Sequence, residues 1–400
     1  MTSRFDVAVI GAGAAGLMCA AVAGQRGRSV VLLDHAERLA EKIRISGGGR
    51  CNFTNRDVRP QHFLSNNPHF SRSALERYTS QDFVDLVMRH RIGFHEKHRG
   101  QLFCDESSER IIAMLVAECD AGGVQWRRPV RIVDLVPEAG AAPSFRIETD
   151  GGAIVATRVV IATGGLSIPK IGATDFAFRT AKRFGLRIVE PRPALVPLTF
   201  AATIWAPFAA LAGLALDVDI RCERPDATAS FREDLLFTHR GLSGPAVLQI
   251  SSYWKPGDAL AIDLAPDADL AAALIAAKST TRQNLSHVLA QHVPKRLAAQ
   301  WQHDEGIDDR RLAEVPNAAL TALARAVERW RVVPDGTEGF RKAEVTAGGV
   351  DTRELSQRTL ESSRVPGLHF VGECVDVTGW LGGYNFQWAW SSGFVAGQAV

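Results

Sequence analysis

The stretch Phe5-Asp-Val-Ala-Val-Ile-Gly-Ala-Gly-Ala-Ala-Gly16, continued by Val30-Val-Leu-Leu-Asp34, has the pattern of a strand, a glycine turn, a helix and a second strand that ends in an acid. Gly11 permits a tight turn, and Gly13 lets the backbone approach a pyrophosphate. Gly16 lets the helix pack closely on its strand. The pattern predicts a dinucleotide-binding unit. An ordinary βαβ crossover with a glycine turn is the alternative.

Two further positions support the dinucleotide interpretation. The helix begins near Ala14, and its N-terminus supplies free N–H groups and the positive end of a dipole. Asp34 stands where a carboxylate accepts hydrogen bonds from a ribose diol. We therefore assign both residues to the nucleotide site.

The composition is that of a soluble globular chain. The 400 residues are 46% hydrophobic and 22% charged, which is enough for two or three domains with their own cores. A formal net charge of +2 gives no bulk electrostatic reason to expect nucleic acid as a partner.

Cysteine usage and hydropathy indicate the compartment. The six cysteines show no C-x-x-C pair and no metal-ligand spacing, so we expect free thiols in a reducing cytosol and no metal site. The sequence contains no uninterrupted apolar run of about 18 residues, so no membrane span is expected. These features predict a cytoplasmic protein.

The order of predicted elements indicates an α/β fold with a discontinuous Rossmann-like domain. Residues 191–266 change to short strands and turns, which predicts an inserted β-barrel-like domain. Residues 267–334 are alanine- and leucine-rich with helical spacing, which predicts an inserted helical domain whose apolar stripe is core rather than a partner groove. Residues 365–371 read as a last strand that rejoins the first domain, so the nucleotide-binding domain is 1–190 and 335–400.

A glycine triplet lies in a polar segment after the first unit and has the parts of an anion or flavin cradle. Successive glycines expose N–H groups, a serine hydroxyl bonds a phosphate, and a guanidinium makes paired hydrogen bonds to a phosphate or a ring carbonyl. A flexible surface loop is the alternative. The residues assigned to the cradle are Ser46, Gly47, Gly49, Arg50, Cys51 and Asn52.

A second glycine-containing turn follows a buried strand. That strand ends at Ala162 and runs into Thr163, Gly164 and Gly165. Glycines allow the backbone to pass a bound dinucleotide without a Cβ clash. We assign these three residues to the cofactor site.

A C-terminal segment combines two carboxylates, a glycine pair and a helix. The carboxylates, which follow a strand, could hold a ribityl chain. The glycine pair opens a helix whose N-terminus would face the N1–C2 carbonyl edge of a flavin, stabilise the negative charge of the reduced ring and raise its reduction potential. The aromatic residue at the third helical position stacks on the ring or belongs to the core. The residues assigned here are Gly372, Glu373, Asp376, Gly383, Tyr384, Asn385 and Phe386.

Six motifs in order along the chain resemble the three-domain bacterial flavoproteins of the BaiN type, which are classed as NAD(P)/FAD-dependent oxidoreductases. The motifs are residues 44–55, 162–165, 195–198, 237–245, 345–350 and 372–393. The resemblance spans the whole chain. It implies FAD in a discontinuous Rossmann-like domain with a β-barrel and a helical domain inserted. Val130 is a further candidate cofactor contact, and Asp34 departs from the glutamate that is common at its position.

The electron donor is not given by these motifs. No second G-x-G-x-x-G follows a strand after residue 34, so NAD(P)H as donor would have to visit the flavin face transiently. Cys51 lacks the second cysteine of a dithiol relay, so disulfide reductase chemistry is not expected.

One segment carries the substrate-side candidates. His239 and Arg240 lead into a helix expected to start near Ser243, an arrangement suited to binding and protonating an anionic or carbonyl-bearing substrate. A structural cap with a solvated arginine is the alternative. Tyr384, at the C-terminal helix start, is the third candidate catalytic residue.

These observations lead to several functional hypotheses. The first is an FAD-dependent oxidoreductase that moves a hydride between flavin N5 and a C–C or C–N bond of a small molecule, with NAD(P)H as donor. The second is a flavoenzyme that reduces a base in ribosomal RNA, of the dihydrouridine type, which the near-neutral charge does not favour unless an arginine face exists. The others are an oxidase of a small amine and a flavin-binding module without turnover. The oligomeric state is left open.

Overall fold

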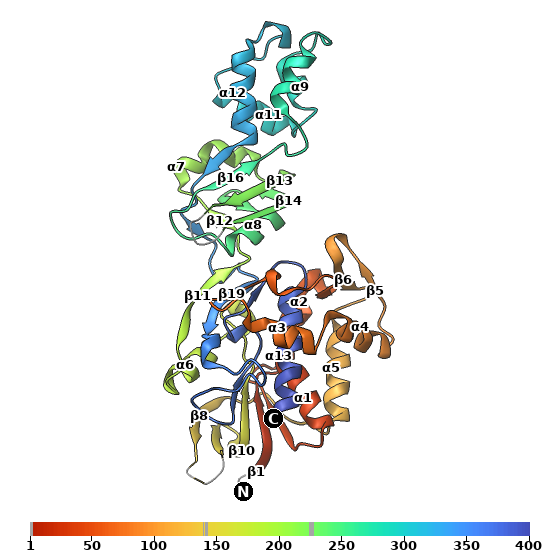
Figure 1. Cartoon of the computed structure of the whole chain (residues 1–400), viewed down its shortest axis with the longest axis vertical. Helices are drawn as coiled ribbons and strands as arrows, with labels where there is room; N and C mark the ends of the chain where they lie inside the picture. Colours follow the sequence, from red (N-terminus) through yellow and green to blue (C-terminus); the bar gives the residue numbers. More distant parts are fainter. Residues whose placement is uncertain (1–2, 139, 141–142, 224–227) are drawn as a thin grey trace. The chain divides into compact units, whose positions relative to one another are not determined.

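The computed structural model divides the chain into two compact units (Figure 1). Unit 1 joins residues 1–193 to residues 344–400 and is therefore discontinuous in sequence, whereas unit 2 is residues 194–343. The residues that the structure describes are 3–138, 140, 143–223 and 228–400. Unit 2 contains the expected insertions from residue 194 onward, and it also includes residues 335–343, which we assigned to the nucleotide-binding domain. The separation of the two insertions at residue 266 stays a prediction.

Unit 1 is built on a seven-stranded sheet with a parallel centre. β1 (Ser3–Ile10) pairs in parallel with β2 (Val30–Leu33) on one side and with β10 (Gly152–Ile161) on the other. β20 (Leu368–Phe370) pairs in parallel with the far edge of β10. This pairing confirms that the C-terminal part of the chain returns to the first domain.

The sheet is extended on both sides of this centre. β7 (Gln125–Arg127) pairs in parallel with β2, and β9 (Phe145–Thr149) and β8 (Ile132–Pro137) add an antiparallel meander to β10. In parallel sheets of this kind, ligands bind outside the carboxyl ends of the strands. The glycine turn after β1 lies at that edge.

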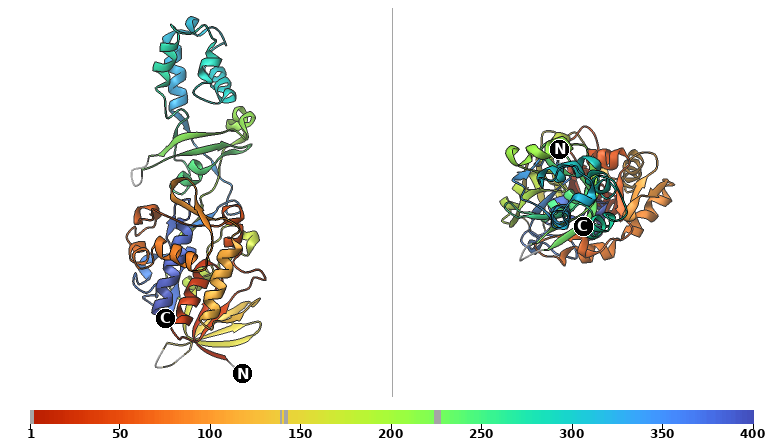
Figure 2. Two further views of the ribbon diagram at one scale, coloured as in Figure 1. Left: turned by 90° about the vertical axis from the view of Figure 1, so that its right-hand side faces the viewer. Right: turned by 90° about the horizontal axis from the view of Figure 1, so that it is seen from above.

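Three helices pack side by side on the sheet of unit 1 (Figures 1 and 2). α1 (Ala14–Gln25) contacts both α5 (Glu109–Ala121) and α13 (Tyr384–Ala399). A Cβ atom on Gly393 would lie 2.4 Å from the Ala15 carbonyl oxygen, and one on Gly397 would lie 2.8 Å from the Cys19 carbonyl oxygen. These two glycines therefore let α13 approach α1 closely.

Shorter elements complete unit 1. β21 pairs with β4, β11 pairs with β19, and β3, β6 and β5 form a small sheet. These elements are α2 (Glu41–Ile45), β3 (Asn52–Asn55), β4 (Phe63–Leu64), α3 (Phe70–Arg77), α4 (Ser80–Arg89), β5 (Phe94–Glu96), β6 (Gln101–Cys104), α6 (Phe176–Arg183), β11 (Ile188–Ala194), β19 (Val345–Val350) and β21 (Thr378–Gly379).

Unit 2 contains a second seven-stranded sheet, in which neighbouring strands pair antiparallel. Its strands, in spatial order, are β17 (Trp330–Val332), β16 (Leu260–Asp263), β13 (Ala215–Cys222), β14 (Ala229–Phe237), β15 (Gly241–Ser243), β12 (Leu198–Thr199) and β18 (Gly336–Thr337). Its helices are α7 (Ala202–Trp205), α8 (Pro245–Ser251), α9 (Leu270–Ala277), α10 (Leu285–Leu289), α11 (Lys295–Asp304) and α12 (Asn317–Glu328).

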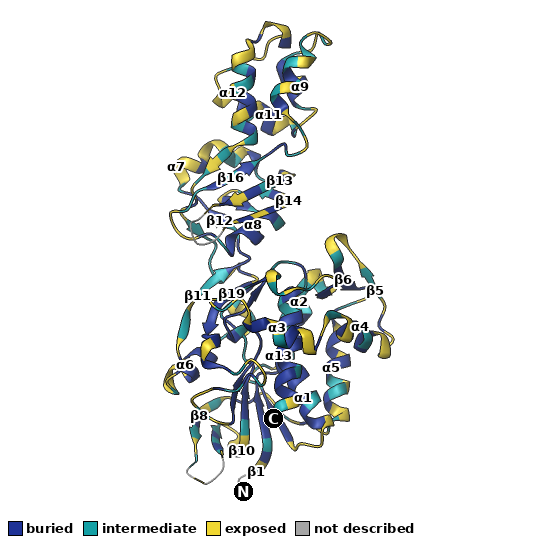
Figure 3. Ribbon diagram, in the orientation of Figure 1, coloured by how far each residue is buried: buried dark blue, intermediate teal, exposed yellow. Residues whose placement is uncertain are grey.

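The apolar stripe of the helical segment belongs to the core of unit 2. Leu285, Leu320 and Leu323 have no exposed surface, and the helices carry their exposed residues on the outside (Figure 3). The indole of Trp330 in β17 contacts that of Trp301 in α11, with ring centroids 5.2 Å apart. The interpretation of the stripe as core rather than partner groove is confirmed. Among the helices of the described residues, none is long and apolar enough to cross a membrane.

A buried histidine in the sheet of unit 1 makes the stability pH-dependent. His369 in β20 has no exposed surface, its Nδ1 lies 3.0 Å from the Thr359 carbonyl oxygen, and its Nε2 has no hydrogen-bond partner among the described residues. Burial lowers the pKa of His369 in the folded state, so below about pH 6.5 the unfolded chain binds a proton that the folded chain does not. Above that pH, His369 therefore does not destabilise the fold, and as the pH falls below it His369 lowers the free energy of unfolding.

We expect His369 to lower the free energy of unfolding by up to about 1 kcal/mol when the pH falls from about 6.5 to about 5.5. Denaturant unfolding of the wild type and His369→Phe at both pH values measures it. The variant should lack that part of the pH dependence. Equal slopes in the two proteins would show that His369 is not responsible.

Candidate cofactor site

The glycine turn after β1 packs as the sequence predicts. Gly11 has φ +105°, and a Cβ on it would lie 2.5 Å from the Ala162 carbonyl oxygen. A Cβ on Gly16 would lie 1.8 Å from the Gly11 carbonyl oxygen. Both glycines are therefore required by close packing between the turn, α1 and the end of β10.

Gly13 differs from its two neighbours because it faces open space. A Cβ on Gly13 would meet nothing within 4 Å, and its φ of −84° is accessible to any residue. Gly13 is the N-cap of α1, which begins at Ala14, has no side-chain cap and has no acidic residue in its first turn. The open space thus lies next to an uncapped helix N-terminus, which suits a pyrophosphate.

The acid at the end of β2 lies beside this turn. Asp34 accepts hydrogen bonds from the backbone N–H groups of Ala12 (2.6 Å) and Ala36 (2.7 Å), one on each carboxylate oxygen. Its backbone carbonyl accepts from the N–H of Val130 (2.8 Å), so the structure brings the two candidate residues together. Each carboxylate oxygen keeps a second lone pair for a ribose hydroxyl.

The loop after β10 contains a polar atom that needs a partner. The hydroxyl of Thr163 is buried and has no hydrogen-bond partner among the described residues. Gly164 has φ +72° and nothing within 4 Å of a Cβ position, whereas a Cβ on Gly165 would lie 2.4 Å from the Thr346 hydroxyl. An orphaned hydroxyl beside an open glycine, at the carboxyl end of the sheet, fits a bound polar ligand.

The glycine triplet forms a tight turn after α2. Gly47, Gly48 and Gly49 all have positive φ, and Cβ positions on Gly48 and Gly49 meet nothing within 4 Å. The Ser46 hydroxyl donates to the Ile43 carbonyl oxygen (2.8 Å), so its hydrogen serves the turn itself. This local geometry explains why the segment cannot continue as a regular helix.

The two residues that follow the triplet differ in exposure to solvent. Arg50 is exposed, and its guanidinium is open to solvent. The Cys51 thiol is fully buried, and burial raises its pKa to about 12. A buried thiol with a raised pKa is a poor nucleophile at neutral pH.

The triplet segment meets the start of the C-terminal helix. In the orientation that satisfies both amide atoms, the Asn52 side chain accepts from the N–H of Gly383 (3.2 Å). Asn55 donates to the Gly382 carbonyl oxygen (3.0 Å). A Cβ on Gly383, which has φ +95°, would lie 2.4 Å from the backbone of Thr54. The triplet segment and the start of α13 therefore lie side by side, and their assembly with the glycine turn after β1 into one cofactor site stays a prediction.

The first residues of α13 are held by their own neighbours. Asn385 accepts from the N–H of Gly379 (2.8 Å) and donates to its carbonyl oxygen (2.9 Å), so its amide fixes the turn before the helix. Phe386 stacks on Trp390 with centroids 5.6 Å apart. Tyr384 is buried and lies at the helix start. Their roles toward a flavin ring stay predictions.

A polar cluster that the sequence did not indicate surrounds Glu373. Its Oε2 lies 2.5 Å from Lys42 Nζ, and its Oε1 accepts from the Ser167 hydroxyl (2.9 Å) and the Thr346 N–H (2.9 Å). Lys42 Nζ also donates to Ser167 (2.6 Å). Four chain segments therefore converge on one carboxylate. Its assignment to a ribityl chain stays a prediction, and Gly372 beside it accepts from Trp388 Nε1 (3.0 Å).

The second carboxylate of this segment also has protein partners. Asp376 is buried, and its Oδ2 accepts from the Asn66 N–H (2.9 Å) and the Ser65 hydroxyl (3.4 Å). Burial raises the pKa of Asp376 above its ordinary value. The side chain therefore holds the loop before α3, and a contact with the cofactor stays a prediction.

His62 is a further polar residue at the start of α13 that sequence reasoning missed. Its ring lies between Trp380 and Tyr384, with centroids 4.8 Å from each. Nδ1 accepts from the Arg59 N–H (3.3 Å), and burial lowers the pKa of His62, so the neutral ring carries its hydrogen on Nε2. No motif surrounds His62, and only the pairing of β4 with β21 brings it here.

The substrate-side candidates belong to unit 2. His239 and Arg240 lie in the turn between β14 and β15, and Arg240 Nη1 lies 3.3 Å from the Glu338 carboxylate. The helix that we expected to start near Ser243 begins at Pro245, directly after the strand residue Ser243 and the N-cap Gly244, so this prediction is confirmed. The place of His239 and Arg240 relative to the cofactor stays a prediction.

The residues of unit 1 fit FAD. The open space at Gly13, the uncapped N-terminus of α1 and the orphaned Thr163 hydroxyl suit a pyrophosphate, and Asp34 suits the adenosine ribose. The N-terminus of α13, fixed by Gly383, would lie at the flavin end. FAD supplies hydride chemistry when it is bound.

Comparison with known proteins gives matches over nearly the whole chain. The family described as HI0933-like protein Rossmann domain matches residues 5–399. The chain is 50% identical over 396 residues to the ribosomal RNA dihydrouridine synthase of Escherichia coli (strain K12), covering 99% of this chain and 98% of that protein. It is 45% identical to the protein of the same name from Haemophilus influenzae, covering 100% and 99%. The 3-dehydro-bile acid delta(4,6)-reductase of Clostridium scindens is 29% identical, covering 98% of each chain.

Proposed function

Because the chain belongs to the HI0933-like Rossmann-domain family, we propose that it reduces a uracil base in ribosomal RNA to dihydrouracil. The chain is an FAD-dependent oxidoreductase, so the interpretation as a flavin-binding module without turnover is not retained. The observation that carries the proposal is the 50% identity, over 99% of the chain, to a ribosomal RNA dihydrouridine synthase. Of the hypotheses drawn from the sequence, RNA reduction therefore takes precedence over reduction of a small molecule.

The chemistry of the proposed reaction suits the site. Reduction of uracil adds a hydride at C6 and a proton at C5, and the overall reaction consumes one NAD(P)H and one proton. The N-terminus of α13 would stabilise negative charge at the pyrimidine edge of the cofactor. Tyr384 places an O–H group at this helix start, where a proton donor is needed, and the neutral ring of His62 packs against it.

The remaining assignments follow from the same proposal. His239 and Arg240 are proposed to contact the carbonyl-bearing base or its phosphate, with Arg240 oriented by Glu338. NAD(P)H is the proposed transient donor, and ribosomal RNA as substrate implies a cytoplasmic enzyme. The closest alternative is reduction of a small conjugated molecule by a BaiN-type enzyme, which the 29% identity to a bile acid reductase supports.

Mass spectrometry of RNA nucleosides tests the proposed function. The purified yellow protein, NADPH or NADH, and ribosomal RNA from a strain that lacks the gene are incubated without oxygen. We expect bleaching of the flavin by one nucleotide, its reoxidation by the RNA, and the appearance of dihydrouridine in the digest. The same RNA without protein, and with protein but without NAD(P)H, should contain none.

Two results would contradict the proposal. Ribosomal RNA from the deletion strain that contains as much dihydrouridine as the parent would exclude this chain as the enzyme. Reoxidation of the reduced flavin by conjugated ketones, with no change in any RNA, would instead support the small-molecule alternative. A flavin that neither nucleotide reduces would remove NAD(P)H as the donor.

A further inference from the structure

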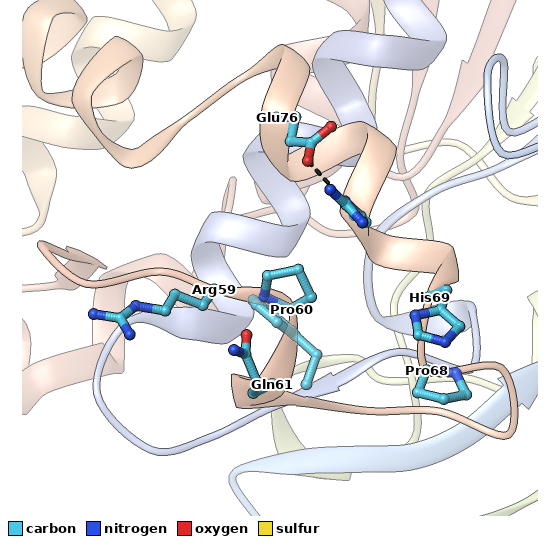
Figure 4. A pocket seen from close by; sticks show the side chains of 8 residues that line it. Arg59, Pro60, Gln61, Pro68, His69 and Glu76 are labelled. Carbon is cyan, nitrogen blue, oxygen red and sulfur yellow. Dashed lines mark hydrogen bonds and ion pairs between the residues drawn. The ribbon is translucent and has the colours of Figure 1, made fainter.

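A hollow lies beside the candidate cofactor site, on the surface between the segment before β4 and helix α3 (Figure 4). Its volume is about 580 Å³, within the range of small-molecule sites. The mechanism above uses none of its lining residues. They are Arg59, Pro60, Gln61, Phe63, Pro68, His69, Arg72 and Glu76.

The hollow combines an apolar interior with a polar rim. Phe63 is buried and forms part of the wall, and Pro60 and Pro68 add flat apolar surfaces. The rim carries the exposed imidazole of His69 and the exposed amide of Gln61. Unpaired RNA bases are recognised by rings and flat groups that stack on them and by amides that bond to their edges.

Two arginines give the rim its positive charge. The Arg59 side chain is 62% exposed and lies 2.6 Å from Asp57, and that of Arg72 is 66% exposed and lies 2.8 Å from Glu76. Exposed ion pairs of this kind contribute little to stability and keep much of their capacity for another anion. Glu76 also lines the hollow, so the rim has no large net positive charge, and an anion there would have to interact with the two guanidinium groups themselves.

Two adjacent residues connect the hollow with the start of α13. Phe63 lines the hollow, and its ring contacts that of Tyr384 edge-on, with centroids 6.2 Å apart. His62 contacts Tyr384 and Trp380. A ligand that contacts Phe63 in the hollow would therefore be separated by this side chain from Tyr384 at the start of α13, where the proposed function places the target base.

We propose that this hollow binds a ribonucleotide that flanks the target uridine, with its base against Phe63, Pro60 and His69 and its phosphates on Arg59 and Arg72. This inference rests on the proposed function, because it takes the substrate to be RNA. Phosphate contacts fix the register of an RNA strand, and stacking of a neighbouring base holds the strand in place. The hollow would therefore orient the strand whose uridine enters the cofactor site.

The test compares two double variants of the FAD-loaded protein. Arg59→Ala/Arg72→Ala removes the rim charges, and Arg146→Ala/Arg179→Ala is the matched control. Arg179 and Asp175 form an exposed i,i+4 pair at 2.8 Å like that of Arg72, and Arg146 pairs with Glu148 two residues along the chain, as Arg59 does with Asp57. Both variants lower the net charge by the same amount. Filter binding to unmodified ribosomal RNA, at several salt concentrations, gives the affinities.

We expect the rim variant to bind RNA about 10-fold more weakly than the wild type. The slope of log affinity against log salt concentration should become shallower by about 0.7 for each lost phosphate contact with a single strand. The control should match the wild type, and flavin content and reduction by NAD(P)H should be unchanged in both. Arg59→Lys/Arg72→Lys should retain much of the affinity because it keeps the charge.

The outcomes separate the two proposals. If the wild type reduces uridine in RNA but the rim variant binds RNA like the control, the hollow does not hold a flanking nucleotide and the proposed function stands. If the wild type neither binds nor reduces RNA, the proposed function itself fails. Equal losses in the rim variant and the control would show a general charge effect and would also overturn the inference.

Discussion

Gly13→Val is expected to give a folded, colourless protein. The backbone at Gly13 has an ordinary extended conformation, and a side chain there meets no protein atom within 4 Å, so the fold should accept valine. The same side chain would fill the space beside the uncapped N-terminus of α1, where the pyrophosphate is expected. We expect a loss of at least about 100-fold in FAD affinity, equivalent to about 2.8 kcal/mol. The ratio of flavin to protein absorbance after purification measures it.

Two other glycine variants serve as controls. Gly151→Val lies in the turn between β9 and β10, where a Cβ has ordinary contacts no closer than 3.5 Å, and it should keep its flavin. Gly16→Ala should instead damage the fold, because its Cβ would overlap the Gly11 carbonyl oxygen at 1.8 Å. A Gly13→Val protein that retains stoichiometric FAD would disprove the placement of the pyrophosphate.

Lys42→Met is expected to destabilise the holoprotein by about 2–3 kcal/mol, since it leaves the carboxylate of Glu373 without its cation. The Lys42 and Glu373 side chains are only 34% and 17% exposed, so water cannot fully replace the lost partner. The Ser167 hydroxyl and the Thr346 N–H remain as donors, which limits the loss. Urea unfolding at saturating FAD gives the change in the free energy of unfolding.

A double-mutant cycle isolates the interaction. We expect Lys42→Met/Glu373→Gln to be less destabilised than the sum of the single variants, with a coupling of about 1–3 kcal/mol. The exposed pair Arg179–Asp175 is the control, because surface pairs couple by less than about 1 kcal/mol. A coupling free energy between Lys42 and Glu373 no larger than that of the control pair would show that their interaction does not stabilise the site.

The parts of the site that depend on backbone conformation could be predicted from the sequence. Gly11, Gly16 and Gly383 are at the positions where the turn, the helix approach and the helix start require a residue without Cβ. These requirements are set by a few neighbouring residues, or by the close approach of one backbone to another. The spacing of the glycines along the sequence is therefore enough to predict where these requirements occur.

The partners of polar side chains could not be predicted in the same way. Glu373 was assigned to the cofactor from its motif, yet its carboxylate bonds to Lys42, which is 331 residues away in the sequence. His62 has no motif and reaches the start of α13 only because β4 pairs with β21. Contacts between distant segments leave no periodic signal in the residues that make them.

The close packing of α13 on α1, with Gly393 and Gly397 against the backbone of α1, affects how the protein is made. During translation, α1 emerges from the ribosome long before α13, because residues 194–343 are synthesised between the two parts of unit 1. About 360 residues separate the end of α1 from the start of α13, so at about 5–20 residues per second the interval lasts roughly 20–70 seconds. During this time the nascent polypeptide presents an apolar helix without one of its partners, so it needs protection from aggregation until α13 has been synthesised.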